Sequence, residues 1–192
     1  MHHARNIFSR WHWPLFLLGL ALVGNVAAAD VAIPFKNSNL EEGSDNRPAA
    51  WQQGVPVDTV QQIWDRTTAH GGKGSLCLKK TARRYFPIAE WRQTIAVDPS
   101  DKPRKVRVKC WVKAEQVTKA VVDVGWQAGK PGHAWASYIG QKQSTDPVAT
   151  HDWKLCDQTV EVPAHATELE IAFQIYGPGS VWFDDLEVAW VE

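Results

Sequence analysis

The stretch ELEIAFQIYG, Glu168–Gly177, predicts both the class of the fold and the direction of its side chains. Two sets of residues alternate along it, an apolar set and a more polar set: Leu169, Ile171, Phe173 and Ile175 against Glu170, Ala172, Gln174 and Tyr176. Successive side chains of a β-strand point to opposite faces. The alternation therefore predicts a strand with one face in a core and the other face turned away from it.

The same period of two recurs from Ser75 to the end of the chain, and no long apolar stripe with helical spacing competes with it. Turn sequences such as HGGKG and YGPGS separate the segments. We expect strands near residues 75–80, 91–97, 105–113, 120–127, 134–141, 153–162, 168–176 and 180–191. Strands of this length, joined by loops with little helix, predict an all-β protein, an antiparallel β-sandwich of the jelly-roll type.

The first 29 residues differ from the rest and predict a signal peptide. Arg5 and Arg10 precede the apolar run WPLFLLGLALVGNVAAA, whose last alanines provide a cleavage site. The alternative is an uncleaved anchor, which is less favoured because the run is shorter than the ~20 apolar residues of a membrane span. Cleavage would leave residues 30–192 as a single secreted, periplasmic or cell-surface domain that does not span the membrane.

The composition shows no excess of positive charge that would attract a polyanion. The chain is 44% apolar and 22% charged, with a formal net charge of zero. The predicted mature part has 19 basic and 21 acidic residues, so its net charge is about minus two. The basic cluster DKPRKVRVK alternates with Val106 and Val108, which favours the exposed face of one strand over a nucleic-acid patch. We expect no nucleic-acid partner.

Three cysteines, Cys77, Cys110 and Cys156, would enter an oxidising compartment after export. At most one disulfide can form among them, and its pairing stays open. Cys110 alternates in phase with Val108 and Val112, so a small buried side chain is the alternative at this position.

The stretch GSVWFDDLEVAW, Gly179–Trp190, contains two adjacent carboxylates, Asp184 and Asp185, inside a predicted strand. Neighbouring side chains of a strand face opposite sides, so both cannot face water if one side is packed. An unpaired buried carboxylate costs several kcal/mol or becomes protonated. A bulge, a hydrogen-bond network or a metal ion would resolve this conflict.

Six short motifs occur in one order along the mature chain: NSNLEEG (37–43), PAAW (48–51), TTAHGGKGSLCL (67–78), VRVKCWVKAE (106–115), DWKLCDQTVEVP (152–163) and GPGSVWFDDLEV (177–188). Together they resemble the galactose-binding-like jelly rolls, and among these the carbohydrate-binding modules that accompany xylanases and glucanases. The resemblance covers essentially the whole mature chain, although Leu40 stands where the family usually has an aromatic residue. It implies a secreted, non-catalytic domain that binds a polysaccharide or another glycan.

In the resembled modules an early Glu and a late Asp bind a structural calcium ion together with backbone carbonyls of a glycine-rich loop. Carried over, the Ca²⁺ ligands are Glu41, Asp184 and the main chain around His70 and Lys73. Calcium prefers many oxygen ligands, and glycines allow a loop to turn its carbonyls toward one point. The alternative is that Asp184 and Asp185 only form hydrogen bonds at an irregularity of the strand.

Nine tryptophans remain in the mature chain, an excess that favours sugar binding because an indole stacks on the apolar face of a pyranose. Phase or the resemblance assigns Trp51, Trp91, Trp126 and Trp153 to the core. The glycan-binding face is predicted from residues that phase or loop position leaves among polar side chains: Trp111, Asp123, Trp135, Tyr138, Gln174 and Tyr176.

Two other classes of function stay open. An exported enzyme acting on a polysaccharide would need two carboxylates at a set separation across a cleft. A structural or adhesive cell-surface domain would keep the fold without a sugar groove. The chain contains no nucleophile elbow, phosphate loop or HExxH motif, which lowers the weight of the enzyme class.

Overall fold

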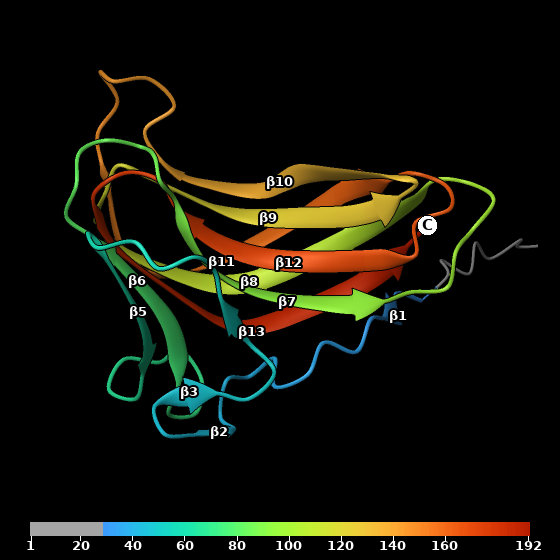
Figure 1. The fold of residues 1–192 in the computed structure, drawn as a ribbon, viewed down its shortest axis with the longest axis horizontal. Helices are drawn as coiled ribbons and strands as arrows, with labels where there is room; N and C mark the ends of the chain where they lie inside the picture. Colours follow the sequence, from blue (N-terminus) through green and yellow to red (C-terminus); the bar gives the residue numbers. More distant parts are fainter. Residues whose placement is uncertain (1–28) are drawn as a thin grey trace, which may run out of the picture.

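The computed structural model describes residues 29–192, which form two antiparallel sheets packed face to face (Figure 1). The first, here the β8 sheet, runs in the order β11 (Ala149–Val162), β8 (Arg104–Val117), β13 (Gly179–Val191), β6 (Ser75–Lys80) and β5 (Val60–Asp65), and β1 (Val31–Ala32) also pairs with β13. The second, here the β9 sheet, runs in the order β10 (Lys130–Gly140), β9 (Lys119–Ala128), β12 (Glu168–Ile175), β7 (Ala89–Ala96) and β4 (Gln52–Gln53). A separate hairpin joins β2 (Gly43–Ser44) to β3 (Arg47–Pro48). The predicted signal peptide, apart from Ala29, lies outside the described residues.

All eight predicted strands are present, with ends that differ by a few residues, and the all-β antiparallel sandwich is confirmed. The sequence did not predict β1 to β5, which lie between residues 31 and 65. The longest of these, β5, reads VQQIWD and lacks a clear alternation. The described residues contain no helix, and hence none long and apolar enough to cross a membrane.

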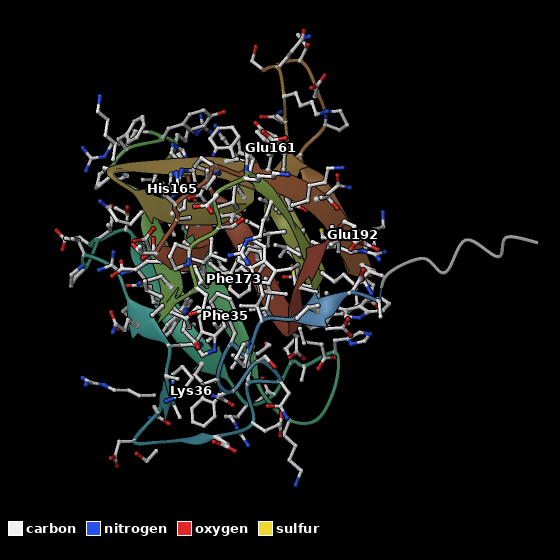
Figure 2. All side chains as sticks on the ribbon, turned by 90° about the vertical axis from the view of Figure 1, so that its right-hand side faces the viewer. Phe35, Lys36, Glu161, His165, Phe173 and Glu192 are labelled. Carbon is white, nitrogen blue, oxygen red and sulfur yellow. The ribbon has the colours of Figure 1, made fainter. Side chains whose placement is uncertain are left out.

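The phase of β12 and β8 predicted their inward side chains correctly, whereas Trp153, which was expected in the core, is only partly buried and lies beside His70. The apolar sets of β12 and β8 are buried: Leu169, Ile171, Phe173 and Ile175 on one strand, Val106, Val108, Cys110 and Val112 on the other. Because these strands belong to different sheets, the core is the layer between the two inner faces. Figure 2 shows Phe35 and Phe173 inside this layer, while Glu161, His165 and Glu192 are exposed.

Phe173 lies at the centre of an aromatic stack that crosses from one sheet to the other. Its ring centroid is 5.1 Å from that of Trp51 and 4.4 Å from that of Phe183. Phe173 is in β12 and Phe183 in β13, and Trp51 immediately precedes β4. Stacked pairs contribute roughly 0.5–1.5 kcal/mol beyond the burial of their apolar area.

A bulge in β10 changes which residues share a face. The register with β9 pairs Trp135 with Asp123 and Tyr138 with Val121, and it shifts between Trp135 and Ser137. Side chains three residues apart face opposite sides of a regular strand. One extra residue in the bulge cancels this offset, so Trp135 and Tyr138 share the outer face of the β9 sheet.

Replacement of the central ring tests this packing. Phe173→Ala removes the middle of the stack and should lower the free energy of unfolding by about 3–5 kcal/mol, because the surrounding rings cannot fill the cavity. Val55→Ala is the control, since Val55 is 80% exposed and should change stability by less than about 0.5 kcal/mol. Urea denaturation measures both. Equal, small losses in the two variants would contradict the central position of Phe173.

Candidate functional site

The outer face of the β9 sheet is hollowed beside β10. The hollow measures about 490 Å³ and lies over β9 and β12. Six of its ten lining residues are polar, and they come from four strands: Thr94, Asp123, Gln127, His133, Glu168 and Glu170. A shallow surface with this many polar side chains suits a ligand that forms many hydrogen bonds.

Asp123 and His133 form a pair at the rim of the hollow. Asp123 is only 6% exposed, and its Oδ1 lies 2.9 Å from Nδ1 of the exposed His133. Burial raises the pKa of the Asp123 carboxyl, whereas the hydrogen bond to His133 lowers it. The carboxylate therefore fixes the orientation of an imidazole that a ligand can reach.

A row of hydrogen bonds crosses the same face. The Tyr176 hydroxyl donates to Oε1 of Gln174 at 2.9 Å, and the Gln174 amide donates to Oε2 of Glu90 at 2.8 Å. Arg92 extends the row through ion pairs, with Nη1 at 3.6 Å from Glu90 Oε1 and 3.9 Å from Glu170 Oε2. These contacts hold polar groups of β12 and β7 in fixed positions across the face.

Four aromatic rings surround the Lys119 ammonium at one end of the face. The ring centroids lie 4.2 Å away for Trp135, 4.5 Å for Tyr176, 5.4 Å for Tyr138 and 5.6 Å for Tyr85. Burial lowers the pKa of Lys119. The cation holds the rings in place through cation–π attraction. Trp135 is 42% exposed and pairs across the strands with Asp123, so an accessible indole adjoins the hollow.

The structure brings five of the six predicted glycan-binding residues together on this face: Asp123, Trp135, Tyr138, Gln174 and Tyr176. Tyr176 lies on the expected face but is only 9% exposed, because the rings of Trp135 and Phe86 pack against it. Its ring packs against that of Trp135 and helps to hold the indole in position.

Trp111 does not join them. It lies in β8 and pairs with Asp184 of β13, on the outer face of the other sheet. Its ring stacks on that of His70, with centroids 3.8 Å apart. The prediction that Trp111 shares a face with Gln174 and Tyr176 is wrong, because phase separates inward from outward side chains and does not say to which sheet a strand belongs.

Sequence reasoning missed His133, Glu90, Lys119 and Tyr85 as members of this site. Glu90 has the same outward phase as Arg92 and Thr94, so the pattern of β7 carried a usable signal. Tyr85 lies in the loop before β7 and Lys119 at the start of β9. Only tertiary packing brings these two together.

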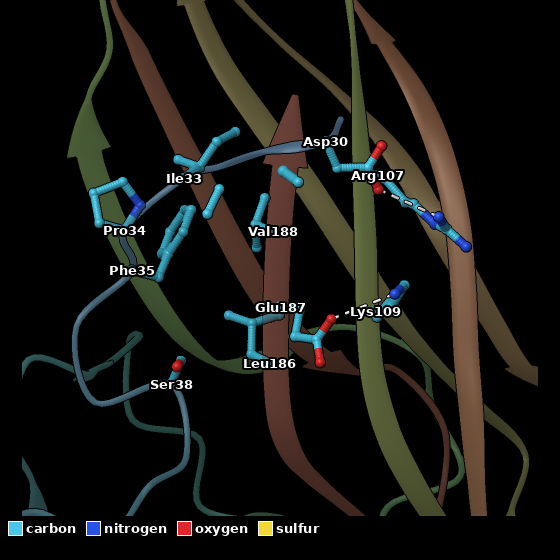
Figure 3. Close-up of a pocket in the computed structure, with 12 residues that line it drawn as sticks. Asp30, Ile33, Pro34, Phe35, Ser38, Arg107, Lys109, Leu186, Glu187 and Val188 are labelled. Atoms are coloured by element: carbon cyan, nitrogen blue, oxygen red, sulfur yellow. Dashed lines mark hydrogen bonds and ion pairs between the residues drawn. The ribbon is translucent and has the colours of Figure 1, made fainter. Parts of the chain in front are cut away.

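A second hollow, of about 440 Å³, lies beside the N-terminal segment (Figure 3). Ile33 and Phe35 face Val188 across it, and ion pairs of 3.4 Å join Asp30 to Arg107 and Lys109 to Glu187. Among the described residues its lining offers no exposed aromatic ring, since Phe35 is only 7% exposed. For this reason we place the candidate site on the β9 sheet.

Two carboxylates accept hydrogen bonds from the glycine-rich loop of residues 70–74 on the opposite side of the molecule. Four backbone N–H groups donate to them at 2.7–3.1 Å: those of His70 and Gly71 to Asp184 Oδ2, and those of Lys73 and Gly74 to Glu41 Oε1. The residues named by the family resemblance therefore converge on one loop. In the structure they interact through amide hydrogens of the loop.

The adjacent carboxylates of β13 lie at a bulge, where the register with β8 shifts between Asp184 and Glu187. Asp184 is fully buried, and burial raises its pKa to about 6 against the opposing effect of three backbone hydrogen bonds. Asp185 has a φ of 47° and contacts His70 Nδ1 at 2.7 Å. The bulge thus directs the two carboxylates to different partners.

No protein-family model matches the chain, and no curated protein does either. Solved structures share its fold. A cyclase from Fischerella sp. TAU is 17% identical with a TM-score of 0.56, covering 84% of this chain and 98% of the cyclase. The CBM22-1 xylan-binding domain of Paenibacillus barcinonensis Xyn10C is 14% identical with a TM-score of 0.55, covering 86% and 99%. These similarities confirm the expected jelly-roll resemblance at the level of the fold.

Substitution of two glycines tests whether the hydrogen bonds between Glu41 and the loop of residues 70–74 stabilise the fold. Gly72 and Gly129 both have positive φ, 60° and 71°, so alanine is strained at either position. A Cβ at Gly72 would lie 2.4 Å from Glu41 Oε1, whereas a Cβ at Gly129 would meet nothing within 4 Å. Gly72→Ala should therefore cost at least about 1 kcal/mol more than Gly129→Ala, because Glu41 must release its hydrogen bonds.

Chemical denaturation of both variants measures this difference. Equal losses of stability would mean that Glu41 moves aside at no cost in free energy. The hydrogen bonds of Glu41 to the loop would then contribute little to the stability of the protein.

Proposed function

We propose that this chain is a polysaccharide-binding domain that binds its ligand on the outer face of the β9 sheet without chemically changing it. The observation that carries the proposal is the position of Trp135, an exposed indole beside a hollow lined by fixed polar groups. The aromatic ring offers a stacking surface for one sugar, and the hollow offers hydrogen bonds for the next.

The stacking surface is rigid before a ligand arrives. Lys119 and the tyrosines around it hold the Trp135 ring, so little side-chain freedom is lost when a sugar stacks on it. An exposed aromatic anchor that is already ordered is the kind of residue that dominates affinity in other interfaces.

The polar part of the face determines which hydroxyl groups fit. Carboxylates accept hydrogen bonds and Arg92 and His133 donate them, so the face can pair with the mixed donors and acceptors of a carbohydrate. Asp123, Glu168 and Glu170 make the hollow acidic. A neutral polysaccharide is therefore the ligand class that we propose, since a uronate-rich chain would be repelled.

The fold by itself does not select this function, because it is shared by a xylan-binding domain and by cyclases. The hollow on the β9 sheet is open to solvent, which favours an extended polymer over a small molecule. The two alternatives are an exported enzyme and an adhesive domain without a sugar groove. The following experiment distinguishes both of them from a glycan-binding domain.

Affinity electrophoresis through gels that contain neutral or acidic polysaccharides tests the proposal. We expect retardation by at least one neutral polysaccharide, with no release of reducing sugars. Trp135→Ala should weaken retention about tenfold or more, as loss of an aromatic anchor does. Trp111→Ala is the matched control, because this tryptophan lies on the other sheet, and retention should be unchanged.

Migration that no polysaccharide affects would overturn the proposal in favour of the adhesive class. Release of reducing sugars would instead support the enzyme. Equal loss of retention in the two tryptophan variants would move the site away from the β9 sheet.

We also propose that Glu41 and Asp184 hold a structural calcium ion together with carbonyl oxygens of the loop of residues 70–73. Within residues 29–192 no basic side chain lies within 4.0 Å of either carboxylate. The buried charge of Asp184 therefore has only backbone dipoles to stabilise it. A divalent cation would supply the missing positive charge and tie the loop to β13.

Calcium titration after chelation tests this second proposal. Saturating Ca²⁺ should raise the Tm by several degrees, because an ion at about 100 times its Kd stabilises the folded state by about 2.7 kcal/mol. Asp184→Asn should abolish the rise. Asp152→Asn, at an exposed carboxylate, should retain it. An unchanged Tm, together with metal analysis that finds no bound calcium, would contradict the site.

A further inference from the structure

Two of the three cysteines face each other in the β8 sheet. Cys110 of β8 and Cys156 of β11 are direct partners in the antiparallel register, within a regular stretch from Lys154 to Val162. Directly opposed residues of an antiparallel pair have Cα atoms about 4.5–5.5 Å apart and side chains on the same face. This spacing lies inside the range that a disulfide requires.

The two thiols differ in environment. Cys110 is fully buried in the core, whereas Cys156 is partly exposed on β11, an edge strand of its sheet. The two thiols are close enough to interact, and Cys156 also interacts with Ser137 of β10. Cys77, the third cysteine, is fully buried in β6 opposite Trp182 and Ile63, so it is not a partner for either.

We infer that Cys110 and Cys156 are a redox-active pair, in which the accessible Cys156 reacts first with an external disulfide and Cys110 then closes a disulfide between β8 and β11. This site is independent of the proposed glycan-binding face. It assigns one pairing among the three that the sequence left open.

The reaction is a thiol–disulfide exchange with a small disulfide such as oxidised glutathione. The Cys156 thiolate attacks one sulfur of the reagent, whose S–S bond breaks and releases one glutathione thiol. The Cys110 thiol then loses its proton and attacks the Cys156 sulfur of the mixed disulfide, which releases the second glutathione. The protein loses two electrons and two protons, and the reagent is reduced to two thiols.

The electrostatics support this order of events. Interactions with Cys110 and Ser137 lower the pKa of Cys156 although burial opposes them. The interaction with Cys156 and complete burial both raise the pKa of Cys110. The more acidic thiol is thus also the more accessible one, as an attacking cysteine requires.

A disulfide here would restrain an edge strand. The bond would close a loop that contains the 45 residues from 111 to 155, which include β9 and β10. Closing a long loop lowers the entropy of the unfolded chain, so the oxidised form should be the more stable one. It would also fix β11 to β8, the strand with which it pairs in the β8 sheet.

Peptide mapping of the purified protein tests the pairing. The protein is incubated with an excess of oxidised glutathione, unfolded in the presence of an alkylating agent, and digested without reduction. Mass spectrometry should find the peptides of Cys110 and Cys156 joined and Cys77 alkylated. Alkylation of both Cys110 and Cys156, a lasting glutathione adduct on Cys156, or a bond to Cys77 would overturn the inference.

Thermal unfolding gives a second readout. The oxidised protein should have a Tm higher than that of the reduced protein by about 5 °C or more. Cys156→Ser, a change on the edge strand that the fold should tolerate, should remove this difference. Cys77→Ala is the matched control and should keep it. A redox-dependent shift that persists in Cys156→Ser would contradict the assignment.

Discussion

The structure depends on burial of the apolar inner faces of two sheets against each other, with Phe173 stacked between Trp51 and Phe183 at the centre. Hydrophobic burial is the main favourable contribution to folding, and it requires that each strand place its apolar residues on one side. Polar residues at alternate positions are therefore forced outward. The polar face that we assign to glycan binding is a direct consequence of the pattern that builds the core.

Bulges adjust this simple division into two faces. In β10 the bulge places Trp135 and Tyr138 on the same outer surface, where Lys119 packs among their rings. In β13 the bulge separates two adjacent carboxylates, so that Asp184 binds the amides of the loop and Asp185 contacts His70. In both places one extra residue changes the side of the sheet to which the following side chains point, compared with a regular strand.

Two neighbouring edge strands contribute residues to both the proposed glycan-binding face and the cysteine pair. β10 and β11 each form one edge of their sheets, and the two strands lie next to each other. β10 supplies Trp135 to the proposed glycan-binding face and Ser137 to the environment of Cys156. Edge strands need protection against pairing with other chains. A covalent link between β8 and β11 would stabilise one such edge without altering the face on the other sheet.

The sequence by itself determined the eight strands from β6 to β13, the inward residues of β8 and β12 and the jelly-roll class, because alternation depends only on the local geometry of an extended chain. It also identified Asp123, Gln174 and Tyr176 as outward residues, and it showed that the adjacent carboxylates of β13 need partners. Tertiary structure alone decided that Trp111 lies on the other sheet, that Lys119 and Tyr85 meet Trp135, and that Cys110 faces Cys156. Strand order and register bring together residues far apart in the sequence, and no local pattern encodes them.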